Sequence, residues 1–91
     1  MDIATTLHQI GRGNLLAISG GRFKMEGDSL VLPVGKGYSV RIRLAPNDTY
    51  TVSREWRGQT YGQMTDIYCE ELSETCYHAS CFHDEWGIQY A

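Results

Sequence analysis

The stretch YSVRIRL, from Tyr38 to Leu44, decides the fold class of this chain. Apolar residues occupy every second position, and a serine and two arginines fall between them. This alternation predicts a β-strand with one buried face and one basic face. The same period returns over residues 50–56, after the turn signal PND. We therefore predict a long antiparallel hairpin over residues 38–56.

Tight turn signals separate further short β-type runs from Asn14 onward, including a strand near residues 60–64. Links this short favour antiparallel neighbours, because a parallel pair needs a crossover of about a dozen residues or more. The pattern predicts a meander of five or six strands. Two glycine-rich signals, Gly20-Gly21 and Gly35-Lys36-Gly37, are predicted to be hairpin turns and not phosphate-binding loops. The signals are Gly20-Gly21, Gly27-Asp28, Gly35-Lys36-Gly37, Pro46-Asn47-Asp48 and Arg57-Gly58.

Two segments have helical periodicity instead. Residues 2–10 place apolar side chains at helical spacing before Gly11, which predicts a short N-terminal helix. With Asp66 as the N-cap, a second helix is expected to run to about Phe82. Its buried side would hold Tyr68, Leu72, Cys76 and Ala79 and pack on the sheet. In the tail, Trp86, Ile88 and Tyr90 alternate, as in a short final strand or an irregular packed segment.

The expected architecture is α+β, with residues 1–91 forming a single compact domain, because 91 residues provide one modest core. No apolar stretch is long enough to span a membrane, and no basic, hydrophobic leader begins the chain, so we expect a cytoplasmic protein without membrane contact. The expected core residues are Ile18, Leu32, Val40, Ile42, Leu44 and Val52.

Charge is distributed unevenly along the chain. All eight lysines and arginines lie at or before Arg57, so residues 1–57, with eight bases and five acids, carry a formal charge of +3. Residues 58–91 contain six acids and no lysine or arginine, a formal charge of −6. Such asymmetry produces a field that acts on binding partners and not on the fold.

The cysteines and histidines of the last quarter provide ligand atoms for zinc, but their spacing does not resemble a zinc site. A Cys81 nucleophile with a nearby histidine and Asp84 would provide the atoms for thiol chemistry. A domain of this size has little room for a substrate cleft and its supporting residues. We expect no enzymatic activity, no cofactor and no metal, and reduced cysteines. The donors considered are Cys69, Cys76, His78, Cys81 and His83.

Four blocks together resemble a family of small proteins of unknown function from bacteriophages, mobile elements and actinobacterial chromosomes. They are AISGGR (residues 17–22), LPVGKGY (32–38), DTYTVSR (48–54) and YHASCF (77–82). The resemblance covers roughly residues 8–83 and implies a compact domain in a phage or prophage setting, and for a phage protein the host cytosol. It implies no catalytic residues. Between the last two blocks, where the family tends to have basic residues, this chain has only Arg57.

The acidic C-terminal third predicts binding to a basic surface of a host protein. On the expected helix, Asp66, Glu70 and Glu74 would form one stripe, where like charges repel by about 0.2–0.5 kcal/mol per pair. A solvated face stabilised by the helix dipole is the plainer interpretation. The docking interpretation makes the chain a non-enzymatic inhibitor of a host defence or nucleic-acid-handling complex, such as an anti-CRISPR protein. Its expected contacts are Tyr61, Asp66, Glu70, Glu71, Glu74, Tyr77, Asp84, Glu85 and Trp86.

A second hypothesis is a small nucleic-acid-binding regulator that uses the basic strand face. The acidic net charge of −3 argues against general affinity for nucleic acid, so this is the alternative. An exposed strand edge could pair two copies of the chain, so a homodimer is a further alternative. The alternative site consists of Lys24, Lys36, Arg41 and Arg43.

Overall fold

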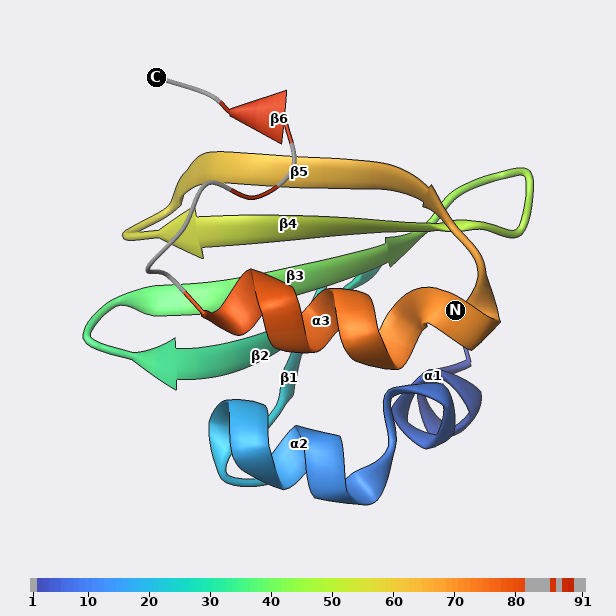
Figure 1. The fold of residues 1–91 in the computed structure, drawn as a ribbon, viewed down its shortest axis with the longest axis horizontal. Helices are drawn as coiled ribbons and strands as arrows, with labels where there is room; N and C mark the ends of the chain where they lie inside the picture. Colours follow the sequence, from blue (N-terminus) through green and yellow to red (C-terminus); the bar gives the residue numbers. More distant parts are fainter. Residues whose placement is uncertain (1, 82–85, 87, 90–91) are drawn as a thin grey trace.

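In the computed structural model, which describes residues 2–81, 86 and 88–89, a six-stranded antiparallel sheet carries three α-helices on one side (Figure 1). The elements are α1 (Ile3–Ile10), α2 (Arg12–Ser19), β1 (Lys24–Glu26), β2 (Ser29–Gly35), β3 (Tyr38–Leu44), β4 (Tyr50–Trp56), β5 (Gln59–Ile67), the 3₁₀ turn η1 (Cys69–Glu71), α3 (Leu72–Ser80) and β6 (Ile88–Gln89). The predicted α+β class is confirmed.

The sheet is a meander in which each strand pairs with its sequence neighbour, in the order β1 to β6. The predicted hairpin is confirmed, because Tyr38 pairs with Trp56 at one end and Leu44 with Tyr50 at the other. The short final strand is also present, since β6 pairs with β5 through Gln63 and Ile88. Its predicted last member, Tyr90, lies outside the described residues.

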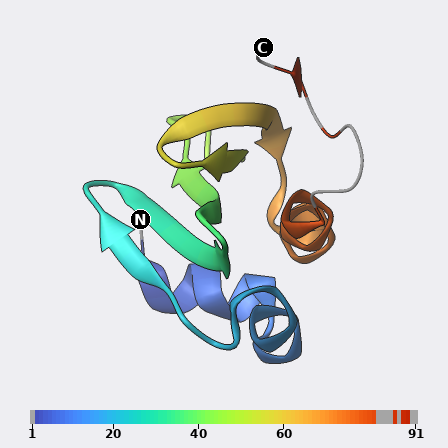
Figure 2. The ribbon, with the colours of Figure 1, turned by 90° about the vertical axis from the view of Figure 1, so that its left-hand side faces the viewer.

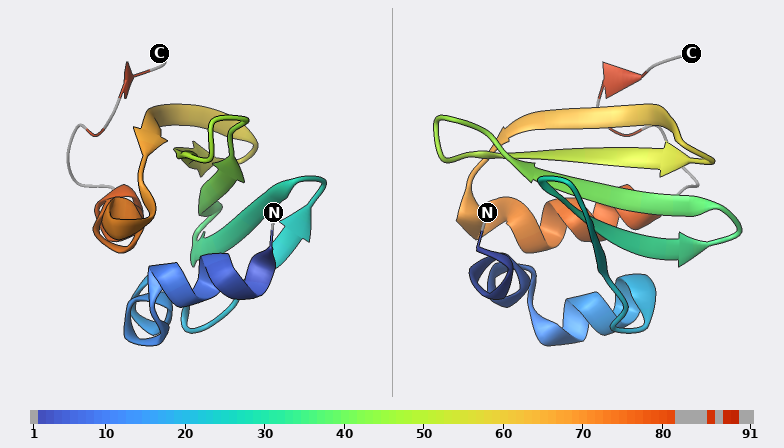
Figure 3. Two further views of the ribbon diagram at one scale, coloured as in Figure 1. Left: turned by 90° about the vertical axis from the view of Figure 1, so that its right-hand side faces the viewer. Right: turned by 180° about the vertical axis from the view of Figure 1, so that it is seen from behind.

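The three helices cover one side of the curved sheet, and both α1 and α2 contact α3 (Figures 2 and 3). Alternate residues of β2, β3 and β4 point to this side and form the core with one face of each helix. Burial of each large apolar side chain contributes about 1.5–3 kcal/mol. The core contains Ile10, Ile18, Leu30, Leu32, Val40, Ile42, Tyr50, Val52, Ile67, Leu72, Cys76, Ala79 and Trp86.

Leu44, a predicted core residue, is 40% exposed, so that prediction is wrong. It is the last residue of β3, where the chain leaves the sheet for the turn at residues 45–49. The other five predicted core residues are buried. Alternation correctly indicates the face of a strand on which a side chain lies, but not where along the strand the helices stop covering it.

The segment from Asn14 onward is helical, which contradicts the β-type run predicted there. Gly20 ends α2 in the left-handed conformation, with φ of 66°. Its N–H donates to the oxygen of Leu16 at 2.9 Å, and the N–H of Gly21 to that of Leu15 at 3.3 Å. These two glycines therefore terminate a helix and are not a hairpin turn. The apolar run before them is too short for its period to separate helix from strand.

The helix predicted to begin at Asp66 begins later, because β5 continues to Ile67. Ile67 pairs with Tyr50 across an irregularity in the β4–β5 ladder, and Asp66 takes a φ of 58° beside it. Asp tolerates this left-handed conformation better than most residues do. Tyr68, predicted to be buried, is 59% exposed as a result. Leu72, Cys76 and Ala79 are buried against the sheet as predicted.

None of the helices in the described part of the chain combines the length and apolar character needed to cross a membrane.

Candidate functional site

Arg54 connects the middle of the sheet to the end of α3. Its side chain projects from β4 on the helix side, and the residue is only 5% exposed. Nε donates to the main-chain oxygen of Ala79 at 2.8 Å, and Nη2 donates to those of His78 at 2.9 Å and Cys81 at 2.8 Å. The last carbonyls of a helix lack partners within it and form the negative end of its dipole. One guanidinium thus satisfies the C-terminus of α3 and holds it on the sheet.

Trp86 packs beside the same guanidinium. The Cζ atom of Arg54 lies 5.4 Å from the centroid of the Trp86 ring, and Trp86 is 8% exposed. We expected Trp86 to be a surface anchor, but a cation–π contact and core packing bury most of the indole. What remains of its surface forms one wall of a groove.

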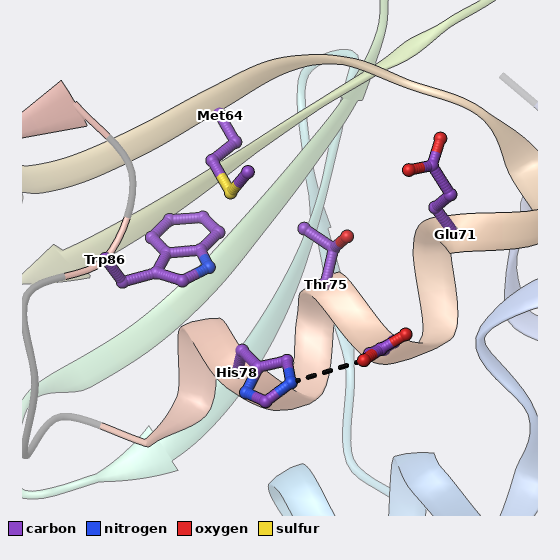
Figure 4. Close-up of a pocket in the computed structure, with 6 residues that line it drawn as sticks. Met64, Glu71, Thr75, His78 and Trp86 are labelled. Carbon is purple, nitrogen blue, oxygen red and sulfur yellow. Dashed lines mark ion pairs between the residues drawn. The ribbon is translucent and has the colours of Figure 1, made fainter.

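This groove, of about 320 Å³, runs between α3 and β5. Figure 4 shows the indole of Trp86 and the thioether of Met64 on the sheet side, across from Thr75 and His78 on the helix. We call it the acidic groove; its lining residues are Met64, Glu71, Glu74, Thr75, His78 and Trp86. Apolar atoms thus form one side, and two carboxylates lie along the other.

Within the described residues, the carboxylates of η1 and α3 lack a basic partner from the sheet. Among residues 2–81, 86 and 88–89, no lysine or arginine forms an ion pair with Glu70, Glu71 or Glu74. Glu74 lies 3.6 Å from Nε2 of His78, and its side chain is 82% exposed. Glu70 accepts a hydrogen bond from the thiol of Cys69 at 3.0 Å, which lowers the pKa of this carboxyl. The negative charge here faces solvent.

Asp66 does not lie on the same helical segment as these glutamates. It belongs to β5, and its Oδ1 accepts a hydrogen bond from Nδ2 of Asn47 at 3.4 Å. The predicted helical stripe of Asp66, Glu70 and Glu74 is therefore wrong, because the first member lies in a strand. The stripe is shorter, from η1 into α3. Asp84 and Glu85 lie outside the described residues.

The two predicted tyrosine anchors lie in different places. Tyr77 is on α3, 45% exposed, and its ring centroid is 6.1 Å from that of His78. Tyr61 is on β5 and contacts Trp56, with ring centroids 6.1 Å apart. Tyr61 does not line the acidic groove. Of these two tyrosines, only Tyr77 lies on the same helix as Glu74.

Met64 and Thr75 were not predicted as site residues, and His78 was considered only as a donor for zinc or thiol chemistry. A helical signal for the groove was present, because Glu71, Thr75 and His78 follow one another at spacings of four and three residues and share a face. No local signal places Met64 opposite them, because that requires β5 to lie beside α3.

The basic strand face is largely paired with acids. Arg41 donates from Nη2 to Glu26 at 2.7 Å and from Nε to Glu55 at 2.9 Å, and Lys24 lies 2.8 Å from Glu26. Hydrogen bonds from Lys24, and then from Arg41, lower the pKa of Glu26 to about 2, and Glu26 raises the pKa of Arg41. Arg43 and Lys36 are exposed, Lys36 in the β2–β3 turn. Two of the four alternative nucleic-acid contacts thus belong to an internal charge network.

The three cysteines differ in environment. Cys69 is exposed, Cys76 is buried and Cys81 is half-buried, and all three are free thiols. Burial raises the pKa of Cys76 to about 12, which keeps it a neutral thiol. Within the described ranges, no three or more His, Cys, Asp or Glu side chains converge as a metal site would require.

Comparison with protein-family models, curated proteins and solved structures gives no match. The resemblance to small phage and mobile-element proteins therefore stays a prediction.

Proposed function

We propose that this protein is a non-enzymatic binding protein that docks a basic segment of a partner protein on the acidic groove. The observation that supports this most is a groove with an apolar side and, along its helical side, carboxylates that pair with no lysine or arginine of the described residues. That combination suits the long side chain of a lysine or arginine, whose apolar stem and charged head need different surroundings.

In the proposed complex, the stem of the partner's side chain lies on Met64 and Trp86, and its charge lies beside Glu71 and Glu74. These glutamates are three residues apart on one helical surface, so they can share one cation. The indole of Trp86 is already fixed by Arg54, so the groove has little conformational entropy to lose on binding.

Glu70 and Tyr77 extend the proposed contact beyond the groove. Both are exposed, and together with Glu74 they follow one another at helical spacing. Exposed carboxylates steer an oppositely charged partner and make association salt-dependent, while a desolvated aromatic ring contributes more of the affinity. We assign Tyr77 the role of anchor and Glu70 a role in association rate.

The specific form that we propose is an inhibitor from a phage or mobile element, which occupies a basic, normally nucleic-acid-binding surface of a host defence complex. The family resemblance suggests the phage setting, and the charge of residues 58–91 suggests the mimicry of nucleic acid. A plasmid-interference assay in a CRISPR-immune host tests the anti-CRISPR version. Undiminished interference in cells that express the protein rejects that version.

The docking mechanism is tested with a partner captured from the native host and then purified. Glu74→Lys and Asp28→Lys change the net charge equally, but Asp28 lies in the exposed β1–β2 turn and does not line the groove. We expect Glu74→Lys to weaken binding about tenfold or more and to reduce its salt dependence. Asp28→Lys should leave both within about twofold.

If Glu74→Lys and the unaltered protein bind with the same affinity and salt dependence, the acidic groove is not the docking site. A solution-NMR titration with an oligo-arginine peptide gives a second readout that needs no partner. The shifted resonances should centre on Met64, Thr75 and His78, and an even spread over the acidic surface would contradict specific docking.

A further inference from the structure

A second surface lies where two hairpin turns meet at one end of the sheet. The β2–β3 and β4–β5 turns lie at the same end, on the left in Figure 1. The N–H of Arg57 in one turn donates to the oxygen of Gly37 in the other at 3.0 Å. Indole Nε1 of Trp56 donates to the oxygen of Lys36 at 3.2 Å. These bonds lock the two turns together.

Each turn places a long cation in a backbone conformation that disfavours it. Lys36 has φ of 56° and Arg57 has φ of 50°, and each precedes a glycine that also has positive φ. Two-residue hairpin turns of this kind favour Asn, Asp or Gly at the first position. A side chain that persists in a strained conformation points to a functional constraint. Here the same exception occurs in two neighbouring turns, and both times the residue is basic.

Three aromatic rings cluster beside these turns, and one of them contacts Arg57. The ring centroid of Trp56 is 6.0 Å from that of Tyr38 and 6.1 Å from that of Tyr61, and Cζ of Arg57 lies 4.7 Å from the indole centroid. Tyr61 is 37% exposed. We call this cluster the hairpin tip; its members are Lys36, Tyr38, Trp56, Arg57 and Tyr61.

A hollow of about 340 Å³ adjoins the hairpin tip. Tyr38 and three turn glycines, Gly35, Gly37 and Gly58, line its near end. Its far end contains Lys24 and Arg41, whose charges are already paired with glutamates. A ligand backbone can approach closely where the lining residues have no side chain. Lys36 and Arg57 are chain neighbours of these glycines, although they do not line the hollow themselves, and they form no ion pair with any carboxylate in the described residues.

We propose that the hairpin tip binds single-stranded nucleic acid. Lys36 and Arg57 hold backbone phosphates, and Tyr61 provides the ring on which a base stacks, backed by Trp56. Binding sites for single strands combine these two features, since phosphate contacts give affinity and aromatic rings accept any base. A duplex keeps its bases stacked inside, so it would be left with two phosphate contacts and bind more weakly.

The hairpin tip shares no residue with the acidic groove, so this inference goes beyond the proposed function and does not depend on it. It also differs from the strand-face hypothesis, because it replaces the paired Arg41 with Arg57. Of the four basic residues in that hypothesis, only Lys36 is retained.

The test is fluorescence anisotropy with a labelled oligothymidylate of about 12 nucleotides, a typical length for such sites, at low salt. Lys36→Asn and Arg57→Asn remove charge but fit the turn better, so thermal stability should be kept or raised while affinity falls. We expect each of these variants and Tyr61→Ala to bind at least about fivefold more weakly than the unaltered protein. The unaltered protein should bind a duplex of the same length more weakly than it binds the single strand.

Arg43→Gln is the matched control, because it removes one exposed cation outside the hairpin tip. It should bind within about twofold of the unaltered protein, as should the groove variant Glu74→Gln. The proposal is overturned if the unaltered protein does not bind the oligonucleotide, or if Arg43→Gln weakens binding as much as Arg57→Asn. It is also overturned if Tyr61→Ala has no effect and inorganic polyphosphate competes as well as the oligonucleotide, which would indicate a simple anion site.

Discussion

Arg54 donates a 2.8 Å hydrogen bond from Nε to the main-chain oxygen of Ala79, and this bond joins the fourth strand to the last turn of α3. Because the same guanidinium also contacts the ring of Trp86, one buried cation supports both walls of the acidic groove. The stability of α3 on the sheet and the shape of the groove therefore depend on the same side chain.

Replacement of Arg54 by leucine should lower the free energy of unfolding by about 3 kcal/mol or more, because three buried or part-buried main-chain carbonyls at the end of α3 lose their donor. Arg54→Lys should recover part of the loss, since one ammonium cannot reproduce the fork of donors. Urea denaturation measures both. The exposed Arg43→Leu should change stability by no more than about 0.5 kcal/mol. Equal effects of Arg54→Leu and Arg43→Leu would show that the buried contacts contribute nothing.

Two glycines of the α2 region should respond in opposite directions to alanine. Gly13 lies inside the helix with open space around its Cα, so Gly13→Ala should raise stability by about 0.5–1 kcal/mol. Gly20 ends the helix with φ of 66°, so Gly20→Ala should lower stability by about 1 kcal/mol. Thermal unfolding followed by circular dichroism compares them. Stabilisation by Gly20→Ala would contradict the left-handed cap.

Acid should weaken the charge network of the open sheet face. The pKa of Glu26 is about 2 in the folded protein and 4.5 in its ordinary state, so the folded state binds this proton less readily. The stabilisation is fully present above pH 4.5 and is lost as the pH falls toward 2. Glu26→Gln should therefore reduce the change of the melting temperature with pH in this window. Asp28→Asn, which changes an exposed carboxyl of the adjacent turn, should show the same dependence of melting temperature on pH as the unaltered protein.

The cysteines should react with iodoacetamide in order of exposure. Cys69 and Cys81 should be alkylated in the native protein, whereas Cys76 should react only on unfolding, because it is buried and its pKa is about 12. Peptide mass spectrometry after timed quenching distinguishes the sites. A Cys76 rate that matches that of Cys69 without denaturant would show that α3 does not pack on the sheet as described.

Much of the fold follows from local pattern, and less of the candidate site does. The glutamates and Tyr77 of the acidic face were predicted because they share a helical period. Met64 and Trp86 were not placed in the groove, because each faces α3 only through contacts between segments that are distant in the sequence. Tyr61 was assigned to the acidic surface, but its neighbour is Trp56.

The order of charges and the alternation of side chains are properties of the chain itself, so the sequence alone determined the hairpin of residues 38–56, the meander and the acidic character of the C-terminal third. These features depend on neighbours two to four positions apart. Only the tertiary structure decided that Asp66 stays in a strand, that Arg54 is buried under α3 and that the turns containing Lys36 and Arg57 meet. Each of these requires contact between distant segments, and the free energy of such contacts overrides the weak preference of a single residue.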